Sequence, residues 1–104
     1  MTFIRLMPAV LALSLPLMAS VAEAGPIQRA CLASDRKAAT QTMCGCIQQA
    51  ADLTLRPADQ RRAAKFFKNP DEAQQVRMSK SDNDNEFWAR YRNFGATAEA
   101  YCAG

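Results

Sequence analysis

The sequence predicts an all-α domain: a small bundle of four to five helices stapled by two disulfide bonds. Helix-forming Ala, Gln, Arg, Lys, Met and Leu dominate the 104-residue chain, and no run of alternating β-branched residues indicates a strand. The cysteines are four in number: Cys31, Cys44, Cys46 and Cys102. An even number of cysteines in a short exported chain is typical of a disulfide framework.

Residues 1–24 have the features of a secretory signal peptide. Arg5 precedes an apolar run, and Ala22 and Ala24 occupy the −3 and −1 positions of an A-x-A cleavage site. The apolar run is shorter than the roughly 20 residues that a membrane span needs, and two prolines interrupt it. We expect cleavage after Ala24, with cleavage after Ala22 as the alternative. The remaining 25–104 domain is then periplasmic or secreted and is not transmembrane.

The first two helices are expected in the half of the domain that holds three of the four cysteines. The first begins at about Pro26, a residue suited to the first helical position, and continues through IQRACLA. The second is expected over about 37–55, because Arg56 precedes Pro57 and is disfavoured in the helical region. Apolar residues of this second helix recur at the spacing of one buried face: Ala39, Met43, Ile47, Ala50, Ala51 and Thr54.

Two shorter helices follow. The third starts with Pro57 at its first position. Its residues for the core are Ala63, Phe66 and Phe67. The fourth is expected over about 70–78, where Asn69 can cap the helix and Glu72 completes a pattern like a capping box.

The last helix, about 84–102, has the strongest pattern. One stripe along it is apolar or aromatic: Phe87, Tyr91, Phe94, Ala98 and Tyr101. Gly95 costs this helix about 1 kcal/mol relative to alanine. A close approach by a neighbouring helix at Gly95 would offset that cost.

Cys44 and Cys46 lie within the second predicted helix, and their relative orientation limits what they can do. Successive helical residues turn by about 100°, so these two lie about 200° apart and a bridge between them would have to unwind the helix. Each can instead reach a different neighbouring helix. We therefore expect Cys31 and Cys102 each to bond to one of Cys44 and Cys46. Two connectivities remain open: Cys31–Cys44 with Cys46–Cys102, or the crossed form.

Other uses of the cysteines are less well supported. A thiol-redox protein that cycles Cys44 and Cys46, as C-x-x-C motifs do, is the alternative interpretation. Zinc ligands usually sit on turns where they converge, so diverging helix faces argue against a four-thiolate zinc site. We expect no metal and no cofactor. The chain has no histidine, and its acids fall mostly at caps or exposed positions, so we expect a protein that is not an enzyme.

The segment QRRAAKFFK places basic residues beside two phenylalanines. Four of its side chains could contact an anionic surface or an acidic envelope protein: Arg61, Arg62, Lys65 and Lys68. The ordinary alternative is a solvated basic face opposite two core phenylalanines. The net charge of +3 is mild and spread along the chain, so nucleic-acid binding is not expected.

Four stretches together, ACLASDRKAAT, MCGCIQQAAD, DQRRAAKFFKNPDEAQQVRMS and FWARYRNFGATAEAYC, resemble a family of small exported four-cysteine proteins of alphaproteobacteria, especially the rhodobacterial group. CGCIQQ and RRAAKFF are the most specific pieces. The family has no established function, but some members carry the label "arginine transporter", which implies an accessory that binds a small, arginine-type ligand. From the residues themselves we expect a small periplasmic binding or envelope-interaction protein.

Overall fold

The computed structural model describes residues 24–103, and this part of the chain contains five α-helices, no strand and two disulfide bonds. The helices are α1 (Pro26–Leu32), α2 (Gln41–Thr54), α3 (Pro57–Lys68), α4 (Pro70–Arg77) and α5 (Asp82–Cys102). The predicted all-α, disulfide-stapled fold is confirmed. Apart from Ala24, the predicted signal peptide lies outside the described residues.

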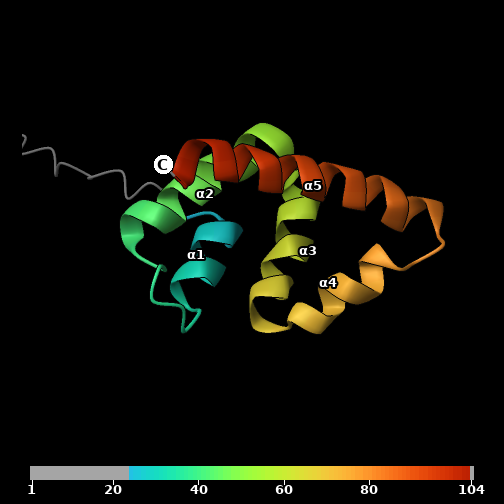
Figure 1. Ribbon diagram of the computed structural model, residues 1–104, viewed down its shortest axis with the longest axis horizontal. Coiled ribbons are helices and arrows are strands. Elements are labelled where there is room, and N and C mark those ends of the chain that lie inside the picture. The colour runs from blue at the N-terminus through green and yellow to red at the C-terminus, as the bar shows by residue number, and fades with distance from the viewer. Residues whose placement is uncertain (1–23, 104) are drawn as a thin grey trace, which may run out of the picture.

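The longest helix, α5, extends across the whole bundle (Figure 1). Its C-terminal half packs along α2, and α3 runs away from its middle (Figure 1). The short α4 leads the chain back toward the start of α5, while α1 packs against both α2 and α3 (Figure 1). Within residues 24–103, no helix has the length and apolar character that crossing a bilayer requires.

All five helices contribute to the core. Its buried apolar residues are Ile27, Ala50, Ala51, Leu55, Ala63, Phe66, Val76, Phe87 and Phe94. Tyr91 stands among four other aromatic rings, with its ring centre 5.3 Å from that of Phe66 in an edge-to-face pair and 5.1 Å from that of Trp88. Such pairs add about 0.5–1.5 kcal/mol beyond the burial of apolar area, so this cluster joins α3 firmly to α5.

Two ion pairs also connect α3 to α5. Arg90 donates from Nε and Nη2 to both carboxylate oxygens of Asp59, at 2.7 and 3.0 Å. Arg62 donates to Asp84 at 2.5 Å, and its guanidinium lies 4.5 Å from the centre of the Phe87 ring. Asp59 and Arg62 of α3 are therefore each paired with a residue of opposite charge on α5.

The start of α2 differs from the prediction. Residues 33–40 form turns, and the helix begins at Gln41 rather than near Lys37. Thr40 has an extended backbone, and its hydroxyl accepts the Met43 N–H at 3.1 Å, which caps the helix at this point. Ser81 caps α5 in the same way by accepting the Asp84 N–H, so α5 begins at Asp82, two residues earlier than expected.

The capping box predicted at the start of α4 does not form. The helix does begin at Pro70, but the Asn69 side chain makes no capping hydrogen bond, and its backbone carbonyl accepts the Glu72 N–H instead. A carboxylate does reach back at the start of α3, where Asp59 accepts the Arg56 N–H at 3.3 Å. The structure thus places this acidic contact one helix earlier than the sequence suggested.

The aromatic stripe of α5 is buried only in part. Phe87 and Phe94 are buried, as predicted, and Tyr91 and Ala98 pack against the core. The prediction for Tyr101 is wrong: its side chain is 75 % exposed, because it lies in the last turn of α5, beyond the core. No close approach offsets the cost of Gly95, since no neighbouring atom lies within 4 Å of the place where a Cβ would stand.

Candidate functional site

The two disulfide bonds have the first of the two connectivities that the sequence left open. Cys31 of α1 bonds to Cys44 of α2, with their Cα atoms 5.6 Å apart, and Cys46 of α2 bonds to Cys102 of α5, with their Cα atoms 5.9 Å apart. Both cysteines of the C-G-C segment are therefore bonded to other helices and not to each other. No cysteine in the described part of the chain is free. This arrangement ties α2 to both of its neighbours.

A cleft of about 810 Å³ opens between α1, α3 and the segment that connects α1 to α2. Its volume lies within the range of about 300–1,000 Å³ that small-ligand sites typically have. Ala30, Ala33 and Ala64 line it with small side chains, and Phe67 adds an aromatic ring. The remaining lining residues are polar or charged: Ser34, Asp35, Arg36, Lys65 and Lys68. We call this site the basic cleft.

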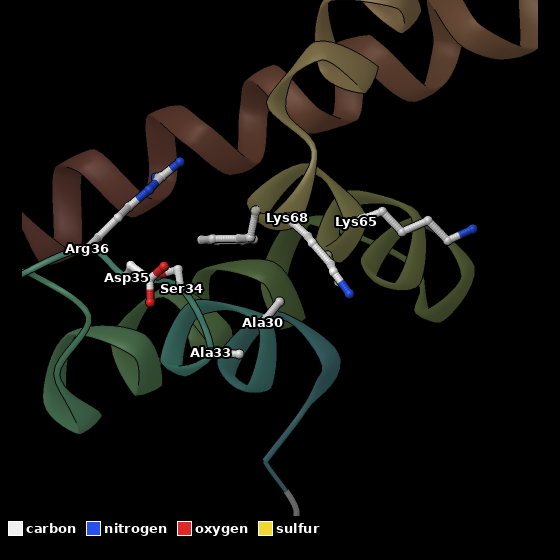
Figure 2. A pocket seen from close by; sticks show the side chains of 9 residues that line it. Ala30, Ala33, Ser34, Asp35, Arg36, Lys65 and Lys68 are labelled. Carbon is white, nitrogen blue, oxygen red and sulfur yellow. The ribbon is translucent and has the colours of Figure 1, made fainter.

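Positive charge stands on both sides of the basic cleft. Arg36 and Asp35 come from the connecting segment, whereas Lys65 and Lys68 extend from α3 on the opposite side (Figure 2). The ion pairs found within residues 24–103 are those of Asp59 with Arg90 and of Arg62 with Asp84, so none of the three cleft cations is neutralised by one. Three positive groups and one negative group give the cleft an excess of positive charge.

Arg36 is held at the junction of the connecting segment, α3 and α5. Its guanidinium lies 5.6 Å from the centre of the Phe67 ring, which is within cation–π range. Burial raises the pKa of the Tyr91 hydroxyl on α5, and the charge of Arg36 opposes that shift. Ser34 is fixed nearby, because its hydroxyl donates to the Cys31 carbonyl at 2.6 Å. The connecting segment is thus ordered where it borders the cleft.

The four basic residues predicted to contact an anionic surface do not form one patch. Lys65 and Lys68 line the basic cleft. Arg62 is paired with Asp84 and packed over Phe87, so its role is structural. Arg61 borders a separate hollow of about 370 Å³ between the start of α1, α2 and α3. The predicted contact with an anionic group stays a prediction, now carried by two of the four residues together with Arg36.

That separate hollow contains a hydrogen-bond network with a structural purpose. The buried Gln48 accepts the Gln28 N–H at 2.9 Å, which satisfies one of the free donors at the start of α1. Its amide donates to Asp52 and to Gln60, at 2.9 and 2.7 Å. No buried side-chain polar atom of residues 24–103 lacks a hydrogen-bond partner. The network therefore accounts for these side chains without a ligand.

The sequence pointed to the α3 half of the basic cleft but missed the Arg36 half. Nothing in the local pattern of residues 34–36 indicates which helix they approach. Arg36 meets Phe67 only because α1 packs against α3 and the Cys31–Cys44 bond holds the start of α2 nearby. Comparison with models of known families, with curated proteins and with solved structures finds no match.

Proposed function

We propose that this protein is a small, exported, non-catalytic binding protein of the periplasm that holds an anionic ligand in the basic cleft. The observation that carries the proposal is the excess of positive charge in a concave site, with Arg36 on one side and Lys65 and Lys68 on the other. Carboxylate and phosphate groups match these donors, because arginine offers a planar fork and lysine a mobile ammonium on a flexible stem.

Export is supported by the paired cysteines and by the predicted signal peptide. Disulfide bonds persist in the periplasm and outside the cell and are rare in a reducing cytosol. All four cysteines of this chain are paired, and the sequence of residues 1–24 has the features of a signal peptide. A binding role is favoured over catalysis because the chain has no histidine to act as a general base.

An arginine-type ligand, implied by the resemblance, fits the basic cleft less well. A guanidinium needs carboxylates, and the cleft offers only Asp35 against three cations. The α-carboxylate of an amino acid could pair with Arg36, but the side-chain charge would be repelled by Lys65 and Lys68. We therefore assign the site to anions and use arginine as the opposing probe.

The proposal is tested by an NMR titration of the isotope-labelled protein with inorganic phosphate and with butyl phosphate. We expect amide shifts in residues 30–36 and 64–68, which decrease as salt rises because the cations are exposed. The variant Lys65→Glu/Lys68→Glu should bind about tenfold more weakly, equivalent to about 1.4 kcal/mol. The matched control is Lys80→Glu/Arg92→Glu, which makes the same change in net charge at two exposed residues that do not line the cleft.

The outcomes separate clearly. Equal weakening by Lys80→Glu/Arg92→Glu would mean that only the overall charge matters and would overturn the assignment to the basic cleft. Larger shifts with arginine than with phosphate, in the same residues, would favour the cationic ligand instead. Circular dichroism of each variant verifies that the helices are retained.

A further inference from the structure

An apolar hollow of about 190 Å³ adjoins the basic cleft. It lies between the connecting segment, α2 and α3, and we call it the apolar slot. Five of its lining residues do not line the basic cleft: Cys31, Ala38, Ala39, Met43 and Ile47. These side chains carry no charge, so this part of the slot is suited to an apolar group.

The slot and the cleft adjoin, because Ser34, Arg36 and Phe67 line both of them. The Phe67 ring stands at this boundary and is partly buried. The Arg36 guanidinium, 5.6 Å from the ring centre, is therefore placed at the opening of an apolar hollow. A cation at such a boundary suits a ligand whose charged end is directly attached to an apolar part.

We propose that the ligand is a single-chain anionic amphiphile, with its carboxylate or phosphate in the basic cleft and its alkyl chain in the apolar slot. This inference rests on the proposed function, because it takes the anionic site as given and names the class of molecule that fills it. The charge of the headgroup complements Arg36, Lys65 and Lys68, and the alkyl chain complements the uncharged lining of the slot.

The volume of the slot limits the length of the ligand's alkyl chain. A water-sized group takes about 30 Å³, so 190 Å³ holds roughly six such groups, which corresponds to a short alkyl segment. The slot is also held in shape, because Cys31 in its wall is bonded to Cys44 of α2. Longer chains would have to leave the slot and extend into water.

A membrane surface fits the same residues less well. Binding to a bilayer needs apolar side chains that insert beside the cations. The three most exposed large apolar residues in the described part of the chain are Leu53, Met78 and Tyr101. They lie at or near the ends of three different helices, and none of them lines the cleft or the slot. The structure thus favours a monomeric amphiphile over a lipid surface.

Calorimetry with a series of straight-chain alkyl phosphates, kept below the concentration at which they form micelles, tests the inference. Each methylene that enters the slot should strengthen binding about fourfold, as expected from about 0.8 kcal/mol per buried methylene. The affinity should stop rising at about six carbons, when the slot is full.

Ala38→Phe, which puts a ring at an exposed position in the slot wall, should remove most of the increase in affinity with alkyl-chain length. Met78→Ala, at an exposed apolar residue that follows α4 and lines neither hollow, is the control and should change nothing.

The controls distinguish this inference from the proposed function. If butyl, hexyl and octyl phosphate bind as weakly as inorganic phosphate, the amphiphile is excluded and the anion site stands. If octyl glucoside, which has no charge, binds as tightly as octyl phosphate, or if no probe binds, both proposals are overturned. If affinity keeps rising with alkyl-chain length and the protein also binds phosphatidylglycerol vesicles, the slot proposal is overturned and a membrane surface is the better explanation. If Ala38→Phe has a normal circular dichroism melt, the loss of the increase in affinity with alkyl-chain length comes from a filled slot and not from unfolding.

Discussion

The ion pair between Asp59 and Arg90 should contribute measurably to stability, and Asp59→Asn tests this. Both carboxylate oxygens of Asp59 accept from the Arg90 guanidinium, at 2.7 and 3.0 Å, and one also accepts the Arg56 N–H. The side chains of Asp59 and Arg90 are 10 % and 29 % exposed. The contact joins the first turn of α3 to the middle of α5, so its loss weakens the link between these helices.

The expected cost follows from the kind of bond. A hydrogen bond to a charged group contributes about 1.5–3 kcal/mol, and exposure of the arginine places this pair toward the lower end. Asparagine has nearly the same shape but offers one acceptor in place of two and carries no charge. We expect Asp59→Asn to lower the free energy of unfolding by about 2 kcal/mol at neutral pH, a large share of the 5–15 kcal/mol that is typical of small domains.

The pH dependence of this cost has a definite sign. The hydrogen bond from Arg90 lowers the pKa of Asp59 in the folded protein, although burial acts in the opposite direction. A carboxyl whose folded pKa lies below its unfolded value of about 3.9 stabilises the fold above that value. The stabilisation is lost as the pH falls through the folded pKa. The difference between the wild type and Asp59→Asn should therefore be constant near neutral pH and shrink below about pH 4.

Urea unfolding followed by circular dichroism, at neutral pH and at a series of acid pH values, measures both effects. A double-mutant cycle with Arg90→Gln isolates the pair, and we expect a coupling of about 1 kcal/mol or more. Coupling within about 0.5 kcal/mol of zero, or a difference that does not change down to about pH 2, would refute the assigned role of the pair.

Three further predictions concern stability. Replacing Cys46 and Cys102 with serine should lower the free energy of unfolding by about 4 kcal/mol in non-reducing urea, because the bond spans 56 residues; a loss below about 1 kcal/mol would contradict the chain-entropy argument. Gly95→Ala should raise the melting temperature by about 4–8 °C, since it adds about 1 kcal/mol to α5 and nothing lies within 4 Å; an unchanged melt would mean that Gly95 has another purpose. Gly25→Ala should lower stability by about 1 kcal/mol in the same melt, because its Cβ would come within 2.4 Å of the Gln48 side chain and displace it from its hydrogen bonds; a neutral result would show that the network can shift.

The fold could be predicted because its main determinants are local. Proline marks the first position of α1, α3 and α4, and the spacing of apolar residues indicates the buried face of α3. The face predicted for α2 is only partly correct: Ala50 and Ala51 are buried, but Cys44 and Gln48 are buried in place of Met43 and Ile47, which are partly exposed. The opposed directions of Cys44 and Cys46 excluded one pairing of the cysteines from helix geometry alone. The choice between the remaining two depends on where α1 and α5 lie around α2, which local patterns do not determine.

The basic cleft could be predicted only in part, for the same reason. Lys65 and Lys68 are close to Phe67 in the sequence, so their proximity is visible in QRRAAKFFK. Arg36 is distant in sequence and enters the site through the packing of α1 on α3. The predicted start of α2 near Lys37 also concealed the turns that carry Arg36, because Thr40 caps the helix later than the pattern suggests.

The two disulfide bonds have different relations to the proposed site. Cys31–Cys44 closes the segment that contains Ser34 and Arg36 of the basic cleft, so it restricts the conformations of the residues that would grip a ligand. Ordering a mobile loop opposes binding, and a loop that is already restricted loses less entropy when the ligand arrives. Neither cysteine of the bond Cys46–Cys102 lines the cleft or the slot. On the proposed function, the first bond therefore supports both folding and binding, whereas the second supports folding alone.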